Sequence, residues 1–132
     1  MIIYKTIKEY SQNDLKELFA SVGWVSAAYS DRLVKAIANS DTVISAWDKE
    51  KLVGLINVLD DGDLTAYVHY LLIRPDYQNS GIGKELIRQL KSIYKDYLYI
   101  CLTAENKEVV PFYEKQGFRV VEGGLPMIIY NP

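Results

Sequence analysis

The sequence predicts an α/β fold in which helices pack on a mixed sheet, and two observations lead to this prediction. Three β-rich segments follow one another with only short polar turns between them, as neighbouring antiparallel strands do: Thr42–Trp47, Leu52–Leu59 and Thr65–Ile73. The third is followed by a helical pattern and then by another strand, Leu98–Thr103. A strand–helix–strand unit in one sheet implies a parallel pair, so the sheet is expected to be mixed.

The residues before these strands predict one more strand and two helices. Ile2–Ile7 is the expected first strand. Ser11 is expected to begin a helix, because Asp14 follows it at capping-box spacing. Trp24–Tyr29 is a connector, and Ser30 caps the second helix. The apolar positions of both helices recur at helical spacing: Leu15, Leu18, Phe19 and Val22 in the first, and Leu33, Val34, Ile37 and Ala38 in the second.

The C-terminal third predicts two helices and a closing pair of strands. The first helix follows a glycine-containing turn, and its apolar face is Ile82, Leu86, Leu90 and Ile93. Asn106–Gln116 is a shorter helix ended by Gly117. Pro111 lies inside it, so either this helix starts late or its first turn is irregular. Phe118–Val121 and Met127–Tyr130 are the expected closing strands.

Composition limits the possible functions. The 132 residues suit one domain, residues 1–132, with one core. A net charge of −2 and a pI near 5.4 argue against a nucleic-acid-binding surface. Cys101 is the only cysteine, which excludes an internal disulfide and a multi-cysteine metal site, and we expect no metal. No apolar run approaches the roughly 20 residues of a membrane-spanning helix, so a cytoplasmic protein is expected.

The turn between the longest strand and its following helix, Ile73–Lys84, has the features of a phosphate-binding loop. Backbone N–H groups converge at such a turn, with the positive end of a helix behind them. A Walker loop is excluded, because Gln78 stands where it needs glycine and Glu85 where it needs Ser or Thr. A dinucleotide fingerprint is excluded by Leu86, which occupies the place of its third small residue.

The pattern Gln78-x-x-Gly81-x-Gly83 resembles the acyl-CoA-binding signature of the GNAT superfamily of N-acetyltransferases. Asn106 followed by Pro111–Phe118 resembles the second signature of that family, and the order of elements agrees over nearly the whole chain. Within the superfamily, the chain is most similar to small bacterial members of the arylalkylamine (serotonin) N-acetyltransferase branch. The resemblance implies a mostly antiparallel sheet with splayed central parallel strands, and transfer of acetyl from acetyl-CoA to a primary amine, of a small molecule or a peptide, in a ternary complex.

The resemblance also implies how acetyl-CoA is held. Backbone N–H groups from Asn79 to Lys84 would bind the pyrophosphate. The strand ending at Ile73 would carry a bulge and splay from the next strand, so that the pantetheine arm pairs with it. The residues implied in cofactor binding are Leu71, Leu72, Ile73, Gln78, Asn79, Ser80, Gly81, Ile82, Gly83, Lys84, Asn106 and Tyr113.

Two catalytic residues are implied. The Tyr113 hydroxyl would face the CoA sulfur, and a phenol with a pKa of about 10 can donate a proton to a developing thiolate; the alternative is a tyrosine on the buried face of a short helix. A backbone N–H at Leu72 or Ile73 would stabilise the thioester oxygen. His69, the only histidine, would help to deprotonate the amine, often through water; the alternative is a structural histidine. The resemblance also implies a difference: many relatives carry Asp or Glu next to this histidine, where this chain has Tyr70, and if that acid handles the amine the proton route here must differ.

The remaining candidates concern the acceptor and its alternatives. Asn106 is a helix N-cap or a polar contact near the pantetheine, and both can hold together. Cys101 lies among apolar neighbours and is expected to be packing rather than an acyl-carrying nucleophile. A non-catalytic acyl-CoA sensor is the alternative function, and a homodimer is plausible for this superfamily. The predicted acceptor-contacting residues are Trp24, Tyr29, Tyr67 and Tyr70.

Overall fold

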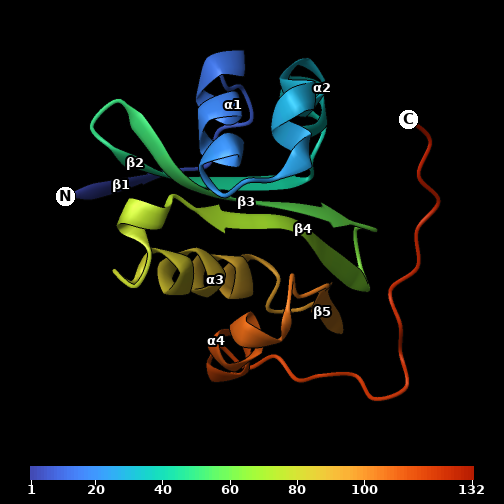
Figure 1. Cartoon of the computed structure of the whole chain (residues 1–132). Coiled ribbons are helices and arrows are strands. Elements are labelled where there is room, and N and C mark those ends of the chain that lie inside the picture. The colour runs from blue at the N-terminus through green and yellow to red at the C-terminus, as the bar shows by residue number, and fades with distance from the viewer.

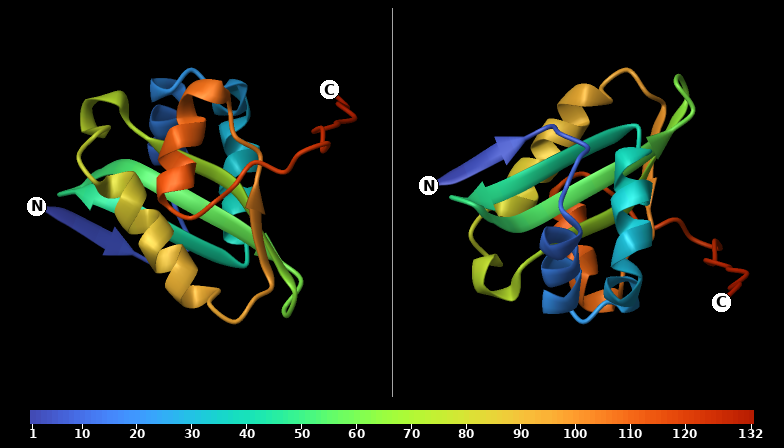
Figure 2. Two further views of the ribbon diagram at one scale, coloured as in Figure 1. Left: turned by 90° about the horizontal axis from the view of Figure 1, so that it is seen from below. Right: turned by 90° about the horizontal axis from the view of Figure 1, so that it is seen from above.

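The computed structural model describes all 132 residues and has a five-stranded sheet with helices on both faces (Figure 1). The strand order is β1-β2-β3-β4-β5, in which the first four strands are antiparallel neighbours and β5 is parallel to β4. Helices α1 and α2 cover one face, and α3 and α4 lie on the other (Figure 2). The strands are β1 (Ile2–Lys5), β2 (Thr42–Asp48), β3 (Lys51–Asp60), β4 (Thr65–Ile73) and β5 (Tyr99–Leu102).

The helices begin and end close to where the sequence predicts. The Ser11 hydroxyl accepts a hydrogen bond from the Asp14 backbone N–H (3.1 Å), which caps α1 as expected. The α-helices are α1 (Gln12–Ser21), α2 (Ser30–Ala38), α3 (Ile82–Ile93) and α4 (Val110–Lys115), and the short 3-10 helices are η1 (Val25–Tyr29), η2 (Pro75–Tyr77) and η3 (Lys107–Val109). No helix is long and apolar enough to cross a membrane.

Two apolar clusters hold the helices on the sheet, one on each face. Leu15, Leu18 and Phe19 of α1 are fully buried against Leu55 of β3 and Leu72 of β4. On the other face, the predicted apolar stripe of α3 packs against β2, β3 and β4 through Ile82, Leu86 and Leu90, which are at most 3% exposed. Only Ile93 of that stripe is exposed, because it lies in the last turn beyond the sheet.

The β3–β4 turn is held by hydrogen bonds to a carboxylate of the turn itself. Asp61 accepts hydrogen bonds from the backbone N–H groups of Asp63, Leu64 and Thr65. These bonds lower the pKa of the Asp61 carboxyl. The structure contains no group of three or more His, Cys, Asp or Glu side chains that could hold a metal ion.

The C-terminal region differs most from the prediction. The shorter helix starts late and irregularly, with η3 preceding α4, because Pro111 lies in the first turn of α4. The predicted strands Phe118–Val121 and Met127–Tyr130 are wrong: neither pairs with the sheet, and this segment runs free of it (Figure 1). Strand composition produces a strand only where a partner edge lies beside it, and this segment pairs with neither open edge of the sheet, at β1 or at β5. The parallel pair therefore lies at the edge of the sheet rather than at its centre.

Cys101 lies in the edge strand β5. Strand β5 is the last strand of the sheet, and its side chains alternate between exposed and half-buried. Cys101 is therefore an exposed free thiol, and the expectation that it is buried packing is wrong.

Candidate active site

A bulge in β4 is the central feature of the site. Val58 of β3 pairs with Val68, but the preceding residue Asn57 pairs with Tyr70, so His69 is an extra residue without a partner. The Tyr70 backbone N–H donates to the Asn57 side-chain oxygen (2.9 Å) instead of to a backbone carbonyl. The bulge that the family resemblance implies is therefore present, and it is centred on His69.

Asn57 fixes the bulge from within the core. Its side chain is 1% exposed, and its amide nitrogen donates to the Ser40 hydroxyl (3.0 Å), so both ends of the amide are hydrogen-bonded. The sequence-based prediction missed this residue. A lone amide inside the apolar run Leu55–Val58 is the signal that could have revealed it, since buried polar groups need defined partners.

Beyond the bulge, β4 has a free edge. Strand β5 pairs with β4 only from Thr65 to Val68, and the residues up to Ile73 have no parallel neighbour. This is the predicted splay. The two strands part immediately before His69, so a gap opens at the bulge.

Backbone groups at this gap alternate in direction. The Arg74 N–H donates to the Val53 carbonyl of β3 (2.8 Å), so the N–H of Leu72, two residues earlier, also faces β3. The N–H groups of Leu71 and Ile73 consequently face the open side. The Ile73 carbonyl faces that side too, where it accepts a hydrogen bond from the Gln78 amide (3.0 Å). This geometry favours Ile73 over Leu72 as a donor to a bound thioester.

The bulge also changes which face of the sheet each side chain occupies. Val68 and Leu71 both pack in the α3 cluster, although in a regular strand an odd spacing would put them on opposite faces. Tyr70 and Leu72 pack on the α1 side. In a strand without the bulge, alternation would put Leu71 on the same face as Tyr67 and His69.

His69 and Tyr70 lie together as a result. Their rings stack with centroids 4.0 Å apart, and Tyr67 lies 6.4 Å from the His69 ring. His69 is at the surface, but the surrounding protein atoms desolvate its ring and lower its pKa below the usual 6.5. The imidazole is therefore neutral at neutral pH, which is the form that can accept a proton.

The loop Gln78–Lys84 leads from the free edge into α3. Asn79 (φ 63°) and Gly81 (φ 90°) both adopt left-handed backbone conformations, and Ser80 donates its hydroxyl hydrogen bond to the Tyr77 carbonyl. Gly81 is the N-cap of α3 and no side chain caps this end. The first-turn N–H groups of Ile82, Gly83 and Lys84 therefore have no capping partner.

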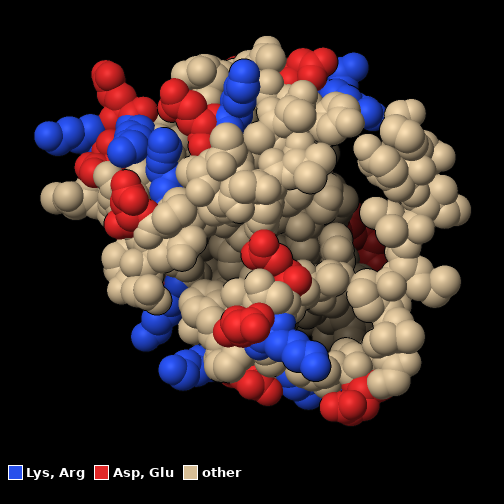
Figure 3. All heavy atoms as spheres, in the orientation of Figure 1, with Lys and Arg blue, Asp and Glu red and all other residues tan.

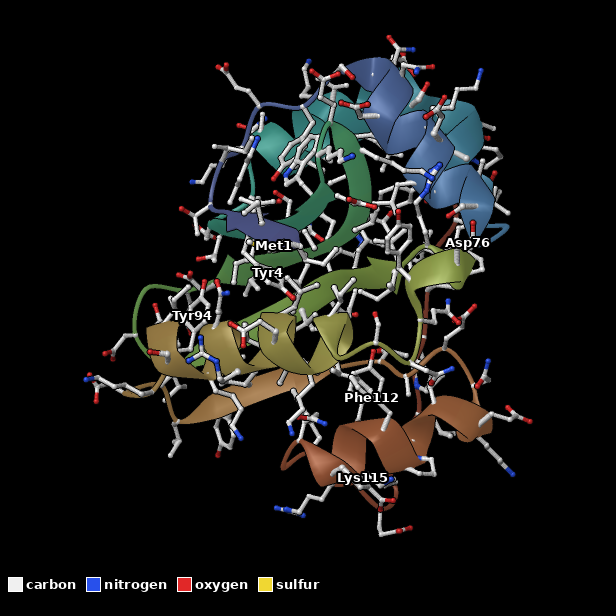
Figure 4. The ribbon with its side chains drawn as sticks, turned by 90° about the vertical axis from the view of Figure 1, so that its left-hand side faces the viewer. Met1, Tyr4, Asp76, Tyr94, Phe112 and Lys115 are labelled. Atoms are coloured by element: carbon white, nitrogen blue, oxygen red, sulfur yellow. The ribbon has the colours of Figure 1, made fainter.

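Gly83 is where α4 approaches α3. A Cβ at this position would lie 3.1 Å from Cζ of Phe112, so the absence of a side chain lets the Phe112 ring cover the first turn of α3. Figure 4 shows Phe112 on the side of α4 that faces α3. This contact places α4 beside the start of α3.

Tyr113 follows Phe112 and is half-buried. Its ring packs edge-on against Phe112 (5.2 Å) and Phe118 (5.7 Å), and its carbonyl accepts the Phe118 backbone N–H (3.1 Å). Burial, and then the nearby negative charge of Glu105, raise the pKa of the Tyr113 hydroxyl. The Tyr113 hydroxyl therefore stays protonated at neutral pH and can donate a proton or a hydrogen bond.

Glu105 connects this end of the site to the connector before α2. Its carboxylate accepts a hydrogen bond from the Trp24 indole N–H (3.0 Å), across 81 residues of sequence. Trp24 is half-buried beside Tyr70, with ring centroids 5.8 Å apart. The sequence-based prediction missed Glu105; its position immediately before Asn106, in the loop after a splayed strand, is the available signal.

The other predicted acceptor residues are more exposed. Tyr29 is 40% exposed and its hydroxyl lies 3.5 Å from that of Tyr130. Tyr67 is 36% exposed and lies within 3.5 Å of the Thr103 hydroxyl. The Tyr70 hydroxyl is instead hydrogen-bonded to Ser26 (3.1 Å) of the connector, another residue that the sequence did not indicate.

Asn106 is a helix N-cap, which is one of the two roles that the sequence predicts for it. Its side-chain oxygen accepts a hydrogen bond from the Val109 backbone N–H (3.2 Å) and caps η3.

A hollow of about 300 Å³ lies at the start of α3 and is lined by Gly81, Lys84, Glu85, Arg88, Lys91 and Gln116. In this hollow Arg88 is paired with Glu85 and Lys91 donates to the Gln116 carbonyl, which leaves the Lys84 ammonium available to an anion. A larger hollow, about 400 Å³, lies at the β2–β3 turn and contains none of the predicted site residues.

Comparison with known proteins identifies the family. The sequence model of the Acetyltransferase (GNAT) family matches residues 7–118. The chain belongs to this family. It is 33% identical to an uncharacterized N-acetyltransferase, ycf52, of Pyropia yezoensis, over 95% of this chain and 74% of that protein. It is 28% identical to a histone acetyltransferase of Glycine max, over 99% of this chain but 62% of that protein.

The fold agrees with a solved GNAT structure. An acetyltransferase of Streptococcus pneumoniae TIGR4 superposes with a TM-score of 0.84 at 30% identity, and the match covers 99% of this chain and 98% of that one. The chain is accordingly a GNAT N-acetyltransferase that depends on acetyl-CoA. The residues of the free edge and of the α3 start fit this ligand, because they offer unpaired backbone groups to an amide-bearing arm and uncapped N–H groups to a pyrophosphate.

Proposed function

We propose that this GNAT domain transfers acetyl from acetyl-CoA to a primary amine by direct attack in a ternary complex. One observation carries the proposal: the bulge at His69 separates a donor edge from an acceptor face. On one side of the bulge the free edge of β4 leads to the start of α3. On the other side, His69 and Tyr70 lie on the face that holds Trp24.

The donor side holds acetyl-CoA in two parts. The N–H groups of the first turn of α3, with the Lys84 ammonium beside them, bind the pyrophosphate. The backbone of Leu71 and Ile73 pairs with the pantetheine arm as a strand would. A donor fixed at both ends is held in the orientation that direct attack requires.

Two groups stabilise the charge that develops during transfer. The N–H of Ile73, or that of Leu71, donates to the thioester oxygen as it becomes negative. Tyr113 donates its proton to the departing CoA sulfur, and its raised pKa keeps it in the donating form. The C–S bond breaks as the N–C bond forms, and the sulfur leaves as a thiol.

The acceptor amine must lose a proton before it attacks. His69 is neutral at neutral pH and accepts that proton directly or through water. The Glu105 carboxylate, beside Trp24, attracts the ammonium form of the acceptor into the site. The aromatic side chains there, Trp24, Tyr70 and His69, favour acceptors with an aromatic or extended apolar group, as in the arylalkylamine branch.

The test is CoA-thiol release from acetyl-CoA across a panel of arylalkylamines, polyamines, amino acids, peptide N-termini and lysine peptides. The lysine peptides are included because one relative is named a histone acetyltransferase. We expect release to match formation of the N-acetylated amine, and cationic acceptors with an aromatic group to have the highest kcat/KM. Tight acetyl-CoA binding with no thiol release from any amine would instead support a non-catalytic sensor.

Glu105→Gln tests the acceptor side separately. Loss of the carboxylate should raise KM for a cationic amine by about tenfold and leave KM for acetyl-CoA unchanged, because one charge-assisted contact is removed. Glu108→Gln is the matched control, since Glu108 is also an exposed glutamate, in η3. Equal effects of the two substitutions on the amine KM would remove Glu105 from the acceptor site.

A further inference from the structure

Four polar side chains are buried in the protein: Ser30, Ser40, Ser45 and Asn57. None of them carries a charge, and the charged side chains lie at the surface with both signs mixed (Figure 3). Ser40 and Asn57, each 1% exposed, are hydrogen-bonded to each other. A buried polar pair whose bonds are all made fixes one local conformation, and this pair lies directly beside the bulge of β4.

The end of α2 holds Ser40 through two hydrogen bonds. Its backbone N–H donates to the Ile37 carbonyl (3.1 Å), and its hydroxyl donates to the Ala36 carbonyl (2.9 Å). A serine hydroxyl has a single hydrogen, and the bond to Ala36 uses it. Towards Asn57, the Ser40 oxygen can therefore only accept a hydrogen bond.

This restriction sets the orientation of the Asn57 amide. Its nitrogen faces Ser40, to which it donates (3.0 Å), so its oxygen faces the other way and accepts the Tyr70 backbone N–H (2.9 Å). In the reversed orientation the amide would present a donor to the Tyr70 N–H and an acceptor to an oxygen that has no hydrogen left to give. Both hydrogen bonds would then be lost, which is costly for buried groups.

The Tyr70 N–H lies where the free edge of β4 begins. Backbone N–H groups alternate in direction along a strand, so the peptide group at Tyr70 also sets the directions of those after it. The N–H groups of Leu71 and Ile73 face the open side as a result. If the Tyr70 N–H lost its partner, the bulge would loosen and these two directions would no longer be fixed.

We propose that Ser40 is a positioning residue for acetyl transfer, which acts through the Asn57 amide to hold the bulge and the free edge of β4 ready for acetyl-CoA. Ser40 is buried and contacts neither the free edge nor His69, so its effect passes through the Asn57 and Tyr70 hydrogen bonds. The inference rests on the proposed function, since it takes this edge as the place where the pantetheine arm binds.

Ser40→Ala leaves one hydrogen of the Asn57 amide without a partner. We expect the Tyr70 N–H to exchange with deuterium about tenfold faster, as followed by NMR, because its acceptor is no longer held in place. The dissociation constant for acetyl-CoA should rise by about fivefold, and kcat should fall by about tenfold, since the binding edge is no longer preorganised.

Ser45→Ala is the matched control. Ser45 is also a fully buried serine whose hydroxyl makes two hydrogen bonds, to the Lys5 carbonyl and from the Trp47 indole, but it lies in β2 on the side of β1. It should lower the Tm about as much as Ser40→Ala does, and leave Tyr70 exchange, acetyl-CoA binding and kcat close to wild type. Equal effects of the two substitutions on acetyl-CoA binding would overturn the proposal.

Two substitutions at Asn57 separate positioning from stability. Asn57→Asp keeps an oxygen for the Tyr70 N–H but buries a charge, whereas Asn57→Leu removes the acceptor and adds no charge. We expect Asn57→Asp, although less stable than wild type, to bind acetyl-CoA within about threefold of it, and Asn57→Leu to bind about tenfold more weakly. Binding that is lost equally in both variants would also overturn the proposal.

Acetyl-CoA binding needs no acceptor amine, so this readout is independent of the proposed transfer. A wild-type chain that binds acetyl-CoA but releases CoA thiol with no amine would contradict the proposed function. The dissociation constants of the Ser40→Ala and Ser45→Ala variants would still decide whether Ser40 positions the free edge.

Discussion

His69 owes its position to a buried amide on the neighbouring strand. The Asn57 side chain takes the Tyr70 N–H that a backbone carbonyl would otherwise bind, and the ladder skips one residue at His69. Beyond this point β4 has no neighbouring strand on the side of β5, and the His69 and Tyr70 rings stack on each other. The proposed donor edge and the proposed acceptor face therefore meet at the same local irregularity.

The proposed base can be tested through pH. Because desolvation lowers the pKa of His69 below 6.5, its neutral form should persist to lower pH, and kcat/KM should fall only as the pH drops through that lowered pKa. His69→Gln should remove this acidic limb and slow turnover by about 10²-fold. The chain has no other histidine, so no second imidazole titrates in this range. An acidic limb that persists unchanged in His69→Gln would show that the base is a different group.

At the scale of elements, one contact holds α4, the helix that carries Tyr113, beside the start of α3. Helix α4 has only six residues and no fully buried side chain, so its position depends on a few contacts. The Phe112 ring over Gly83 is one of them, and the Phe118–Tyr113 backbone bond is another. A change at Gly83 should therefore affect both stability and the donor site.

Gly83→Ala is expected to displace the Phe112 ring. The new methyl group would lie 3.1 Å from Cζ of Phe112, and overpacking typically costs about 1–3 kcal/mol, of which the better helix propensity of alanine offsets about 1 kcal/mol. Thermal unfolding should show a lower Tm, and KM for acetyl-CoA should rise.

The matched control is Gly124→Ala, because the nearest atoms there are 3.8 Å away. Adding Phe112→Leu to Gly83→Ala makes room for the methyl group and should restore part of the lost stability. The overpacking explanation fails if Gly83→Ala unfolds at the wild-type temperature and binds acetyl-CoA with the wild-type KM.

At the scale of the whole molecule, local patterns predict the chain well where neighbours in sequence are also neighbours in space. The β2–β3–β4 meander, both helices before it, and the turn into α3 follow from β-rich composition, helical spacing, caps and glycines. The family resemblance adds the bulge and the splay. The prediction fails at the closing strands, because strand composition cannot specify whether any strand edge lies close enough to pair with them.

Site residues follow the same rule. Gln78, Gly81 and Gly83 stand in one short motif, and the sequence alone is enough to predict them as site residues. Glu105 and Trp24 are hydrogen-bonded although 81 residues separate them in the sequence. The Asn57 side chain on β3 accepts a hydrogen bond from Tyr70 on β4. The roles of these residues therefore depend on tertiary structure. Cys101 is exposed only because β5 ends the sheet, which no local pattern records.

The central claim is that acetyl passes directly from CoA to an amine at the gap between β4 and β5, with Tyr113 giving the sulfur its proton. Its most direct test is the steady-state rate of CoA release by Tyr113→Phe, with Tyr4→Phe, on β1 at the far edge of the sheet, as control. We predict that kcat falls about 10²-fold in Tyr113→Phe while KM for acetyl-CoA changes little, because the ring remains and only the proton donor is lost. A kcat equal to that of Tyr4→Phe and of the wild type would contradict the account.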